Sequence, residues 1–252
     1  MCGRYAYTLP PDAMLALFKM LNELMYPPRY NIAPTQPIPV VWEQQGRRTA
    51  QLVRWGFVPG WVKDPREFPL LINARSEGMA EKPAFRDALK HQRCVIPASG
   101  YYEWMKRPDG SKQPYYITEA DGRTMAFAGL YSTWMGPEGE EIDTAAIVTV
   151  APNEEVSQVY DRMPALLRGE EAVDNWLNVR EVRAPEAQLL AAPPPPGTMK
   201  FHPVGKAIGN ANAEGPDLIR PLGPEEVAAL EAEAKPLRRK KAAGGSSQLD
   251  LF

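Results

Sequence analysis

Prolines interrupt this chain at short intervals along almost its whole length. The sequence has 27 of them among 252 residues, roughly twice the usual frequency of about 5%. Proline lacks a backbone N–H and is excluded from helix interiors and central strands, so the elements between prolines must be short. Because the intervening segments are apolar, the sequence predicts many short packed elements joined by shaped loops rather than disorder.

Most of these segments have the composition of β-strands. They are rich in β-branched and aromatic residues and are bounded by glycine or proline. They cover residues 39–43, 50–58, 94–104, 114–118, 125–134 and 144–151. Asp109-Gly110 and Asp121-Gly122 are typical of hairpin turns. We therefore expect a strand-rich, mostly antiparallel core.

Helical patterns flank this strand-rich region. Residues 11–25 carry apolar side chains at the i, i+3, i+4 and i+7 spacing of an amphipathic helix. Helical composition returns at residues 170–179, 185–192 and 224–234. The sequence therefore predicts an α+β fold, with flanking helices, in one domain over residues 1–234.

Composition excludes several classes of protein. With 29 basic and 31 acidic residues the net charge is −2, which excludes a protein that coats DNA through net charge but permits a local basic groove. There is no run of about 18 apolar residues, so we expect no membrane partner. Two cysteines are too few for a disulfide framework, and we expect reduced thiols in the cytoplasm.

Histidine is even scarcer. His91 and His202 are the whole set, which excludes a three-histidine zinc site. The spacing of His91 and Cys94 resembles half of a metal site, but two ligands without a second pair are more often structural. We therefore expect no metal site.

The second residue, Cys2, acquires distinctive chemistry if Met1 is removed. It then presents an α-amine with a pKa of about 7.7–8.0 beside a thiol with a pKa of about 8.5. Such an aminothiol condenses with an aldehyde to an imine, and the thiol then closes a thiazolidine ring. The same group could act as an amidase nucleophile with its own amine as base, or Cys2 could simply be a small buried residue.

Six short motifs occur in a characteristic order. They are MCGR at residues 1–4, YNIAP at 30–34, WGFVPGW at 55–61, LINARSE at 71–77, PASGYYEW at 97–104 and DRMP at 161–164. In this order they resemble the SOS response-associated peptidase (SRAP) family. The resemblance extends over about residues 2–222 and includes HPVGKAIGN at 202–210.

The resemblance implies both a fold and an activity. The fold is a single domain of curved β-sheets in a barrel-like core with flanking helices. The activity is sensing of abasic sites in single-stranded DNA and their covalent capture through Cys2, because an opened abasic sugar offers a free aldehyde. Autocatalytic removal of Met1 is the peptidase activity that the family name records. No cofactor is implied.

The resemblance also assigns catalytic roles. Cys2 matches the crosslinking nucleophile, and Asn73 matches an asparagine that hydrogen-bonds the captured sugar. Glu103 lies in an apolar segment, where desolvation would raise its pKa toward acid–base work; without the family match, a solvent-exposed strand position is the simpler interpretation. The family histidine is replaced by Tyr160, a poor base at neutral pH, and His202 is a second source of an imidazole.

Further matches imply contacts with DNA. Arg4, Arg75 and Arg162 correspond to arginines that hold the phosphate backbone, which suits the forked guanidinium. Trp61 matches an aromatic side chain on which a base stacks. Pro34 lies on a loop that, in the family, wedges against the DNA beside the lesion.

The end of the chain differs from the rest. Residues 235–247 form a basic and then small, flexible linker, and residues 248–252 read QLDLF. This peptide resembles the segment by which bacterial replication and repair proteins bind the sliding clamp. The resemblance implies that Leu249, Leu251 and Phe252 fill an apolar pocket while Gln248 bonds to its rim.

The sequence thus favours a monomeric, cytoplasmic, bacterial-type protein that captures abasic sites in single-stranded DNA and is delivered to replication by its tail. Two alternatives stay open. One is an N-terminal cysteine peptidase or amidase. The other is a non-catalytic DNA adaptor recruited by the clamp, in which Tyr160 marks a lost active site.

Overall fold

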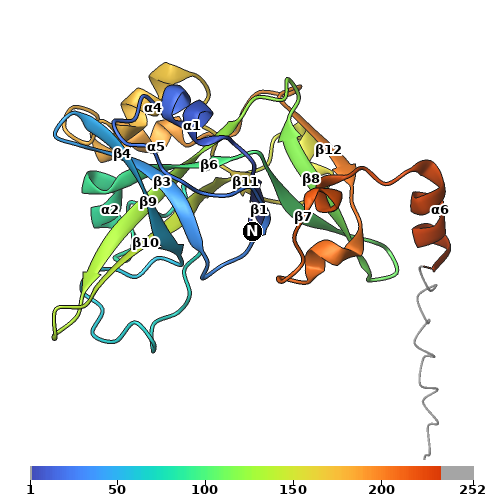
Figure 1. Ribbon diagram of the computed structural model, residues 1–252, viewed down its shortest axis with the longest axis horizontal. Helices are drawn as coiled ribbons and strands as arrows, with labels where there is room; N and C mark the ends of the chain where they lie inside the picture. Colours follow the sequence, from blue (N-terminus) through green and yellow to red (C-terminus); the bar gives the residue numbers. More distant parts are fainter. Residues whose placement is uncertain (1, 234–252) are drawn as a thin grey trace, which may run out of the picture.

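The computed structural model describes residues 2–233 and is built around a small β-barrel (Figure 1). The barrel strands are β3 (Pro37–Gln44), β4 (Arg47–Trp55), β6 (Arg93–Ala98), β9 (Met125–Met135) and β10 (Glu141–Val150). They follow the order β10-β4-β3-β6-β9, and β9 pairs again with β10 to close the circuit. All of these pairings are antiparallel except that of β4 with β10.

Side chains fill the barrel interior as far as the backbone allows. The barrel strands carry apolar residues on both of their faces. Fully buried examples are Val41, Ile96, Phe127 and Ile147. Gly129 is required at one close approach, because a Cβ built there would lie 2.9 Å from the Cys94 sulfur. The barrel is therefore a packed core rather than a pore.

A second, open sheet lies beside the barrel. It consists of β12 (Met199–Pro203), β8 (Lys112–Glu119), β7 (Gly100–Lys106), β1 (Tyr5–Tyr7) and β2 (Arg29–Ile32), in that order and all antiparallel. In Figure 1 it extends to the right of the barrel. β1, which follows Cys2, is thus an inner strand with hydrogen-bonded neighbours on both sides.

Two very short strands line the end of β10 that approaches this sheet. β5 (Asn73–Arg75) pairs with β10 in parallel, with Asn73 opposite Ile147 and Arg75 opposite Thr149. β11 (Met163–Pro164) pairs with β10 antiparallel. The motifs around residues 73 and 162 are therefore brought together on one strand end.

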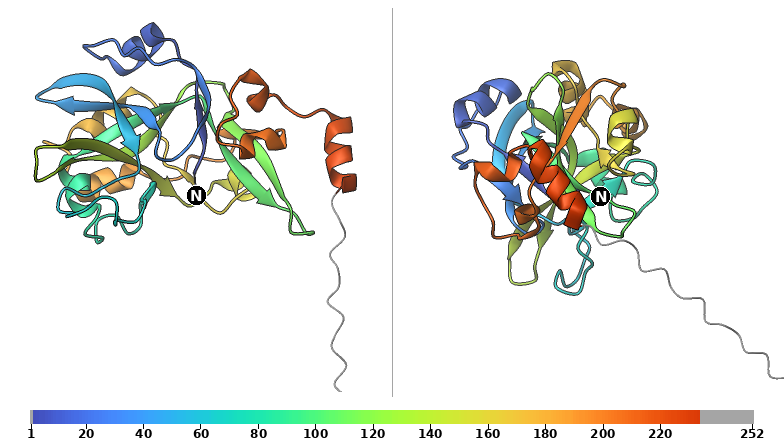
Figure 2. Two further views of the ribbon diagram at one scale, coloured as in Figure 1. Left: turned by 60° about the horizontal axis from the view of Figure 1, so that its bottom comes forward. Right: turned by 90° about the vertical axis from the view of Figure 1, so that its right-hand side faces the viewer.

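Short helices surround the two sheets. They are α1 (Pro11–Phe18), α2 (Arg86–His91), α3 (Glu154–Ser157), α4 (Glu170–Leu177), α5 (Ala184–Leu190) and α6 (Pro224–Glu233), with 3-10 turns η1 (Lys206–Gly209) and η2 (Pro216–Ile219). α1, α2, α4 and α5 lie around the barrel, whereas α6 lies beyond the second sheet (Figure 2). No helix of residues 2–233 is long and apolar enough to cross a membrane.

The expected α+β fold with a barrel-like, mostly antiparallel core is confirmed, but three local expectations are wrong. The helix over residues 11–25 ends at Phe18, because Lys19 adopts a left-handed conformation (φ 51°). The single strand over residues 94–104 is divided at Ser99 into β6 and β7, which belong to different sheets.

The third correction concerns the turns. Asp109-Gly110 does join a hairpin, that of β7 and β8. Asp121-Gly122 instead connects β8 to β9, which lie in separate sheets and do not pair. The linker at residues 235–247 and the peptide at residues 248–252 lie outside the described residues.

Candidate active site

Cys2 lies at the entry to β1, where backbone pairing holds it firmly. Tyr5 pairs with Tyr101 of β7 on one side and with Ile32 of β2 on the other. The Asn73 side chain donates a hydrogen bond from Nδ2 to the Cys2 carbonyl oxygen at 3.0 Å. The Cys2 side chain is completely buried, and its backbone is tied to β5 of the barrel sheet through Asn73.

The environment of Cys2 disfavours the thiolate. Burial raises the pKa of the thiol well above its ordinary value, and negative charge on Glu103 raises it further. The backbone N–H of Arg4 acts in the opposite direction. A sulfur nucleophile at this position therefore needs a nearby base.

The Glu103 carboxyl group has a proton affinity that suits it to act as this base. It lies on β7 with only 3% of its surface exposed, so the interpretation of Glu103 as a solvent-exposed strand residue is wrong. Burial raises the pKa of Glu103 to about 7. At neutral pH the carboxyl group is thus divided between its acidic and basic forms, which suits transfer of protons in both directions.

Asn73 approaches Cys2 from β5, which pairs with the barrel strand β10. Its Nδ2 is used by Cys2, but its Oδ1 is buried and has no hydrogen-bond partner within the described part of the chain. Buried amide oxygens are almost always paired in native proteins. The free acceptor is therefore available to a bound molecule.

Tyr160 follows α3 and is half-buried. Burial raises the pKa of Tyr160, and negative charge on Glu103 raises it further, so the two side chains are electrostatic neighbours. Both line a groove of about 830 Å³ that also includes Lys106, Lys112 and Asp161. The site thus opens to solvent on the Tyr160 side.

His202 does not supply the missing imidazole. It lies on β12 opposite Tyr116, and its Nε2 is 2.9 Å from the Ile219 carbonyl oxygen. Tyr116 in turn pairs with Tyr102, the neighbour of Glu103 on β7. Because successive strand residues point to opposite faces, His202 is on the face of the sheet away from Glu103.

Two predicted phosphate-binding arginines differ in their contacts. Arg162 donates to both oxygens of Glu77, at 2.7 and 3.0 Å, and to the Thr149 carbonyl oxygen at 2.6 Å. Arg75 is exposed at the end of β5 and forms no ion pair within residues 2–233. Glu77 was not singled out from the sequence, although it ends the LINARSE motif.

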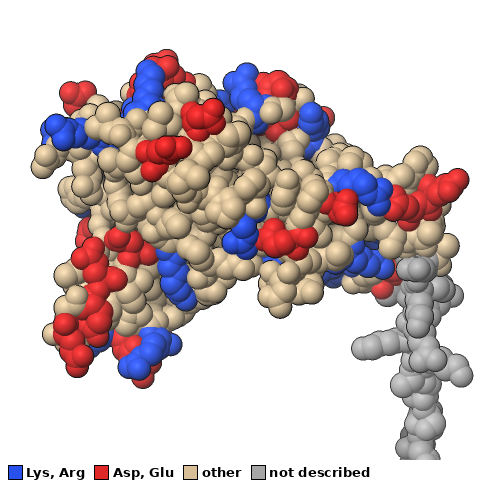
Figure 3. Space-filling model, in the orientation of Figure 1, with Lys and Arg blue, Asp and Glu red and all other residues tan. Residues whose placement is uncertain are grey.

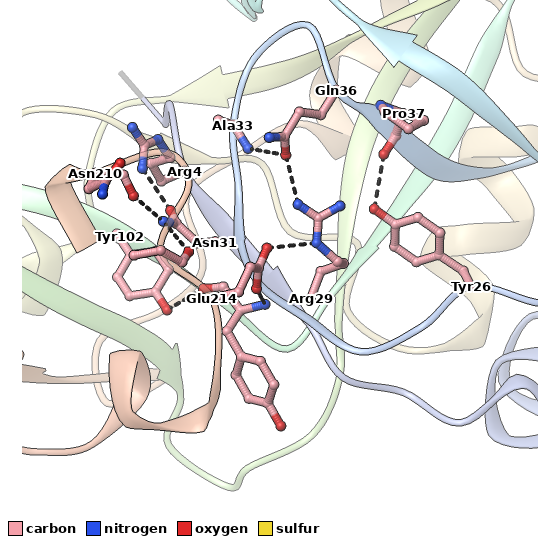
Figure 4. A network of polar contacts seen from close by, with 12 residues as sticks. Arg4, Tyr26, Arg29, Asn31, Ala33, Gln36, Pro37, Tyr102, Asn210 and Glu214 are labelled. Carbon is pink, nitrogen blue, oxygen red and sulfur yellow. Dashed lines mark hydrogen bonds and ion pairs between the residues drawn. The ribbon is translucent and has the colours of Figure 1, made fainter. Parts of the chain in front are cut away.

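Arg4 belongs to a polar network that joins the C-terminal segment to the second sheet (Figure 4). Its Nη1 donates to Asn31 Oδ1 and to the Ile208 carbonyl oxygen, both at 2.7 Å. The Asn31 amide donates in turn to the carbonyl oxygens of Asn210 and Ala213. Sequence reasoning missed Asn31, although it lies within the YNIAP motif; the structure uses it to anchor residues 208–213.

Trp61 and Pro34 lie on loops near the barrel end. Trp61 is 60% exposed and contacts the Phe68 ring edge-on at 5.8 Å. Pro34 is half-buried and precedes Thr35, which has a positive φ of 74° and donates its N–H to the Trp55 carbonyl oxygen. An indole that is largely exposed and is held by an edge-on contact with a neighbouring ring is available for stacking.

On one face of the molecule, charge is distributed unevenly but without one large basic patch. On the face shown in Figure 3, basic and acidic side chains are interspersed, and acidic ones gather at the tip of the β9–β10 hairpin. That region of the sequence contains Glu138, Glu140, Glu141 and Asp143. Within residues 2–233 no group of histidine, cysteine and carboxylate side chains could hold a metal ion.

The family model for SOS response associated peptidase (SRAP) matches residues 1–211. The chain belongs to the SRAP family. The match includes every candidate site residue up to Arg162, so the buried cysteine, amide and carboxyl cluster lies within the SRAP region. The resemblance inferred from the short motifs is confirmed.

Several SRAP relatives have similar lengths. The abasic site processing protein YoqW of Bacillus subtilis is 35% identical over 222 residues, which cover 87% of this chain and 99% of the relative. YedK of Escherichia coli, also named an abasic site processing protein, is 34% identical with coverages of 88% and 100%. The chicken protein HMCES, with the same description, is 34% identical over 83% of this chain and 71% of its own.

Solved structures share the SRAP fold. A protein from Bacteroides thetaiotaomicron is similar with a TM-score of 0.78 at 24% identity, covering 88% of this chain and all of the other. A phage-related protein from Bordetella bronchiseptica has a TM-score of 0.66 at 27% identity, with coverages of 82% and 95%. The combination of a closed barrel and a second sheet is therefore not peculiar to this chain.

Proposed function

We propose that this SRAP protein captures abasic sites in single-stranded DNA by covalent attachment to Cys2, after Met1 has been removed by the chain itself. The amine of Cys2 attacks the aldehyde of the opened sugar, and loss of water leaves an imine. The thiol then adds to the imine carbon, its proton passes to nitrogen, and a thiazolidine ring is complete. The descriptions of the relatives as abasic site processing proteins support this substrate.

One observation carries the chemical part of the proposal. Glu103, whose pKa burial raises to about 7, is an electrostatic neighbour of the Cys2 thiol. It accepts the thiol proton in its basic form and helps water leave the carbinolamine in its acidic form. Asn73, already bonded to the Cys2 carbonyl, offers its unpaired Oδ1 to a hydroxyl or N–H of the captured sugar.

The same proposal assigns the DNA contacts. Arg75 binds a phosphate, for which its exposed guanidinium, without an ion pair in residues 2–233, is suited. Trp61 stacks on a base, and Pro34 lies beside the lesion. Arg4 and Arg162 already have protein partners, so their contact with phosphate requires their remaining nitrogens or an exchange of partners.

A single experiment tests the covalent step. Protein with verified removal of Met1 is incubated with an abasic single-stranded oligonucleotide and analysed under denaturing conditions. We expect an adduct that is lost in Cys2→Ala and kept in Cys94→Ala, because Cys94 is buried inside the barrel. No adduct with any protein, together with unchanged DNA binding by Cys2→Ala, would indicate the non-catalytic adaptor instead.

The remaining alternative is a peptidase. Turnover of a small amide substrate that is abolished in Cys2→Ala but unaffected in Arg75→Ala would indicate an N-terminal cysteine hydrolase. If mass spectrometry shows Met1 still attached in soluble, purified protein, the aminothiol does not exist and the thiazolidine proposal is refuted.

The tail is a separate part of the proposed function. Residues 248–252 bind the replication sliding clamp, a proposal that rests on the QLDLF sequence alone. Deleting these five residues is expected to abolish co-elution with the clamp while leaving adduct formation intact. Retained co-elution would refute the assignment.

A further inference from the structure

Two buried tyrosine hydroxyls, on the strands next to Cys2, have no hydrogen-bond partner in the part of the chain that the structure describes. The Oη atoms of Tyr5 and Tyr101 are both inaccessible to solvent, and neither is paired within residues 2–233. Burying an unpaired hydroxyl disfavours folding, whereas phenylalanine would fill the same space without that cost. A pair of such hydroxyls therefore calls for an explanation outside stability.

The two rings are held in fixed positions. Tyr5 of β1 and Tyr101 of β7 are direct cross-strand partners. Each contacts Phe127 edge-on, at ring-centre distances of 6.1 and 6.0 Å, and Tyr5 also contacts Trp55 at 5.4 Å. Because the aromatic packing fixes the rings, it also fixes where the hydroxyls lie.

The hydroxyls lie on the catalytic side of the sheet. Residues 101 and 103 of one strand point to the same face, and cross-strand partners share a face, so Tyr5 and Tyr101 point to the side of Glu103. Burial raises the pKa of both phenols. Negative charge on Tyr26 and then on Cys2 raises the pKa of Tyr5 further, and negative charge on Cys2 and Glu103 raises that of Tyr101. Cys2 is thus an electrostatic neighbour of both phenols, and it directly precedes the strand on which Tyr5 pairs with Tyr101.

We propose that the Tyr5 and Tyr101 hydroxyls donate hydrogen bonds to the Cys2 sulfur when it becomes a thiolate, and thus act as positioning residues for the nucleophile. The proposal deepens the function proposed above and depends on it for its purpose. The thiol proton passes to the Glu103 carboxylate, and the two O–H groups stabilise the sulfur anion. When sulfur bonds to the imine carbon its charge disappears, and nitrogen takes up a proton from Glu103.

Tyr7 provides a matched control. It lies on the same strand and is equally buried, but its hydroxyl already donates to the Met14 sulfur at 2.9 Å. Removing the Tyr7 hydroxyl therefore deletes an existing bond away from Cys2. Removing the hydroxyl of Tyr5 or Tyr101 deletes no hydrogen bond among residues 2–233.

The test measures the Cys2 thiol directly, without DNA. In a Cys94→Ala background with Met1 removed, the rate of alkylation by iodoacetamide is followed against pH. We expect Tyr5→Phe and Tyr101→Phe each to raise the thiol pKa. The double variant should lower the alkylation rate at neutral pH by about tenfold, because a rise of one unit in the thiol pKa lowers the thiolate fraction tenfold. Tyr7→Phe should leave the thiol pKa unchanged.

Thermal unfolding provides a second readout. Tyr5→Phe and Tyr101→Phe are expected to melt at the same temperature as the parent or higher, and Tyr7→Phe to melt lower. Equal thiol pKa values in all variants, or an equal rise in Tyr7→Phe, would overturn the proposal. So would a loss of folding in the Tyr5 or Tyr101 variants, because it would show that the hydroxyls are structural.

These outcomes are separable from the proposed function. A raised thiol pKa in the two variants, with no DNA adduct from the parent protein, would support the hydroxyl pair and refute DNA capture. Adduct formation by the parent with an unchanged thiol pKa in the variants would support capture and refute the role of the pair.

Discussion

At the scale of single residues, the neighbourhood of Cys2 contains several buried polar groups. Glu103 is buried, and Asn73, Tyr5 and Tyr101 each hold a polar atom without a partner in the described part of the chain. Core packing alone favours apolar residues at such positions. Retention of polar groups here marks a place where chemistry, rather than stability, determines the residue types.

Glu103 has a measurable effect on stability against pH. Its pKa is about 7 in the folded chain, against an ordinary value of 4.5. Between these values the folded state holds a proton that the unfolded state has lost, so the free energy of unfolding falls as pH rises from about 4.5 to about 7, by up to about 3 kcal/mol. Urea unfolding at several pH values measures the fall, and Glu103→Gln should remove it.

The pKa of Glu77 is shifted in the opposite direction to that of Glu103, so Glu77 affects stability at a different pH. Its hydrogen bonds from Arg162 lower its pKa below the ordinary 4.5, so its contribution to stability is present above that value and decreases as pH falls through the lowered pKa. Glu77→Gln should therefore leave the fall between pH 4.5 and about 7 intact. A Glu103→Gln protein with the same pH dependence as its parent would contradict the assignment.

In the proposed chemistry, Tyr160 limits the rate of adduct formation. A phenol whose pKa is raised by burial and by Glu103 is a poor base at neutral pH, whereas an imidazole exchanges protons there. We expect Tyr160→His to accelerate adduct formation on an abasic oligonucleotide by about 10- to 100-fold, within the usual range of acid–base catalysis. Time courses measure the rate, Tyr160→Phe is the control, and unchanged rates in Tyr160→His would refute the prediction.

At the scale of elements, the buried side chain of Arg93 joins α2 and α4 to the barrel strand β6 through hydrogen bonds. Arg93 begins β6 and is 1% exposed. Its guanidinium donates to the carbonyl oxygens of Leu89, Trp176, Asn178 and Val182 at 2.5–3.0 Å. The side chain thus satisfies the carboxyl-terminal ends of α2 and α4 and the turn that follows α4. Burial lowers its pKa to about 10, which leaves it protonated at neutral pH.

Arg93→Met is expected to lower the free energy of unfolding by about 3 kcal/mol or more, because several buried carbonyl groups lose their donor. Arg93→Lys should rescue only a small part of the loss, since one ammonium cannot serve four divergent acceptors. Chemical denaturation measures both. Arg66→Met is the control, because Arg66 is exposed and, among the described residues, forms its ion pair with Asp64 alone; a loss no larger than in this control would contradict the prediction.

At the scale of the whole molecule, the candidate site lies where the two sheets meet. Cys2 and Glu103 come from the second sheet, whereas Asn73 and Arg75 come from β5 beside the barrel strand β10. Any change in the relative position of the sheets alters the distances within the site. The network of Arg4 and Asn31 reinforces the second sheet with the C-terminal segment (Figure 4).

The number of local phosphate contacts determines how DNA affinity responds to salt. Because the chain carries a net charge of −2, binding of single-stranded DNA depends on a few local contacts. The contribution of each contact can therefore be measured by substituting one residue. Arg75→Gln is expected to weaken binding of single-stranded DNA and to reduce the slope of log affinity against log salt by roughly 0.7, the value of one phosphate contact. Arg220→Gln, far along the chain and paired with Glu226, should leave the slope unchanged; equal slopes in all three proteins would refute the contact.

The sequence predicted most barrel strands because their signal is local. Residues 125–134 and 144–151 are mainly apolar segments, and they lie in β9 and β10 with shifts at the ends. The short strands β1, β2, β5, β11 and β12 were not predicted. Strands of two to five residues are shorter than the window in which periodicity is visible, and pairing with distant partners creates them.

Composition and motif order were sufficient for the family, the fold class and the identity of the candidate nucleophile, because residue types and their spacing carry that information directly. Only the tertiary structure decided that Glu103 is buried and has a raised pKa, that His202 lies on the wrong face, and that Tyr5 and Tyr101 have unpaired hydroxyls. Burial, the face to which a side chain points and the pairing of a polar atom depend on residues far away in the chain, and no local pattern contains them.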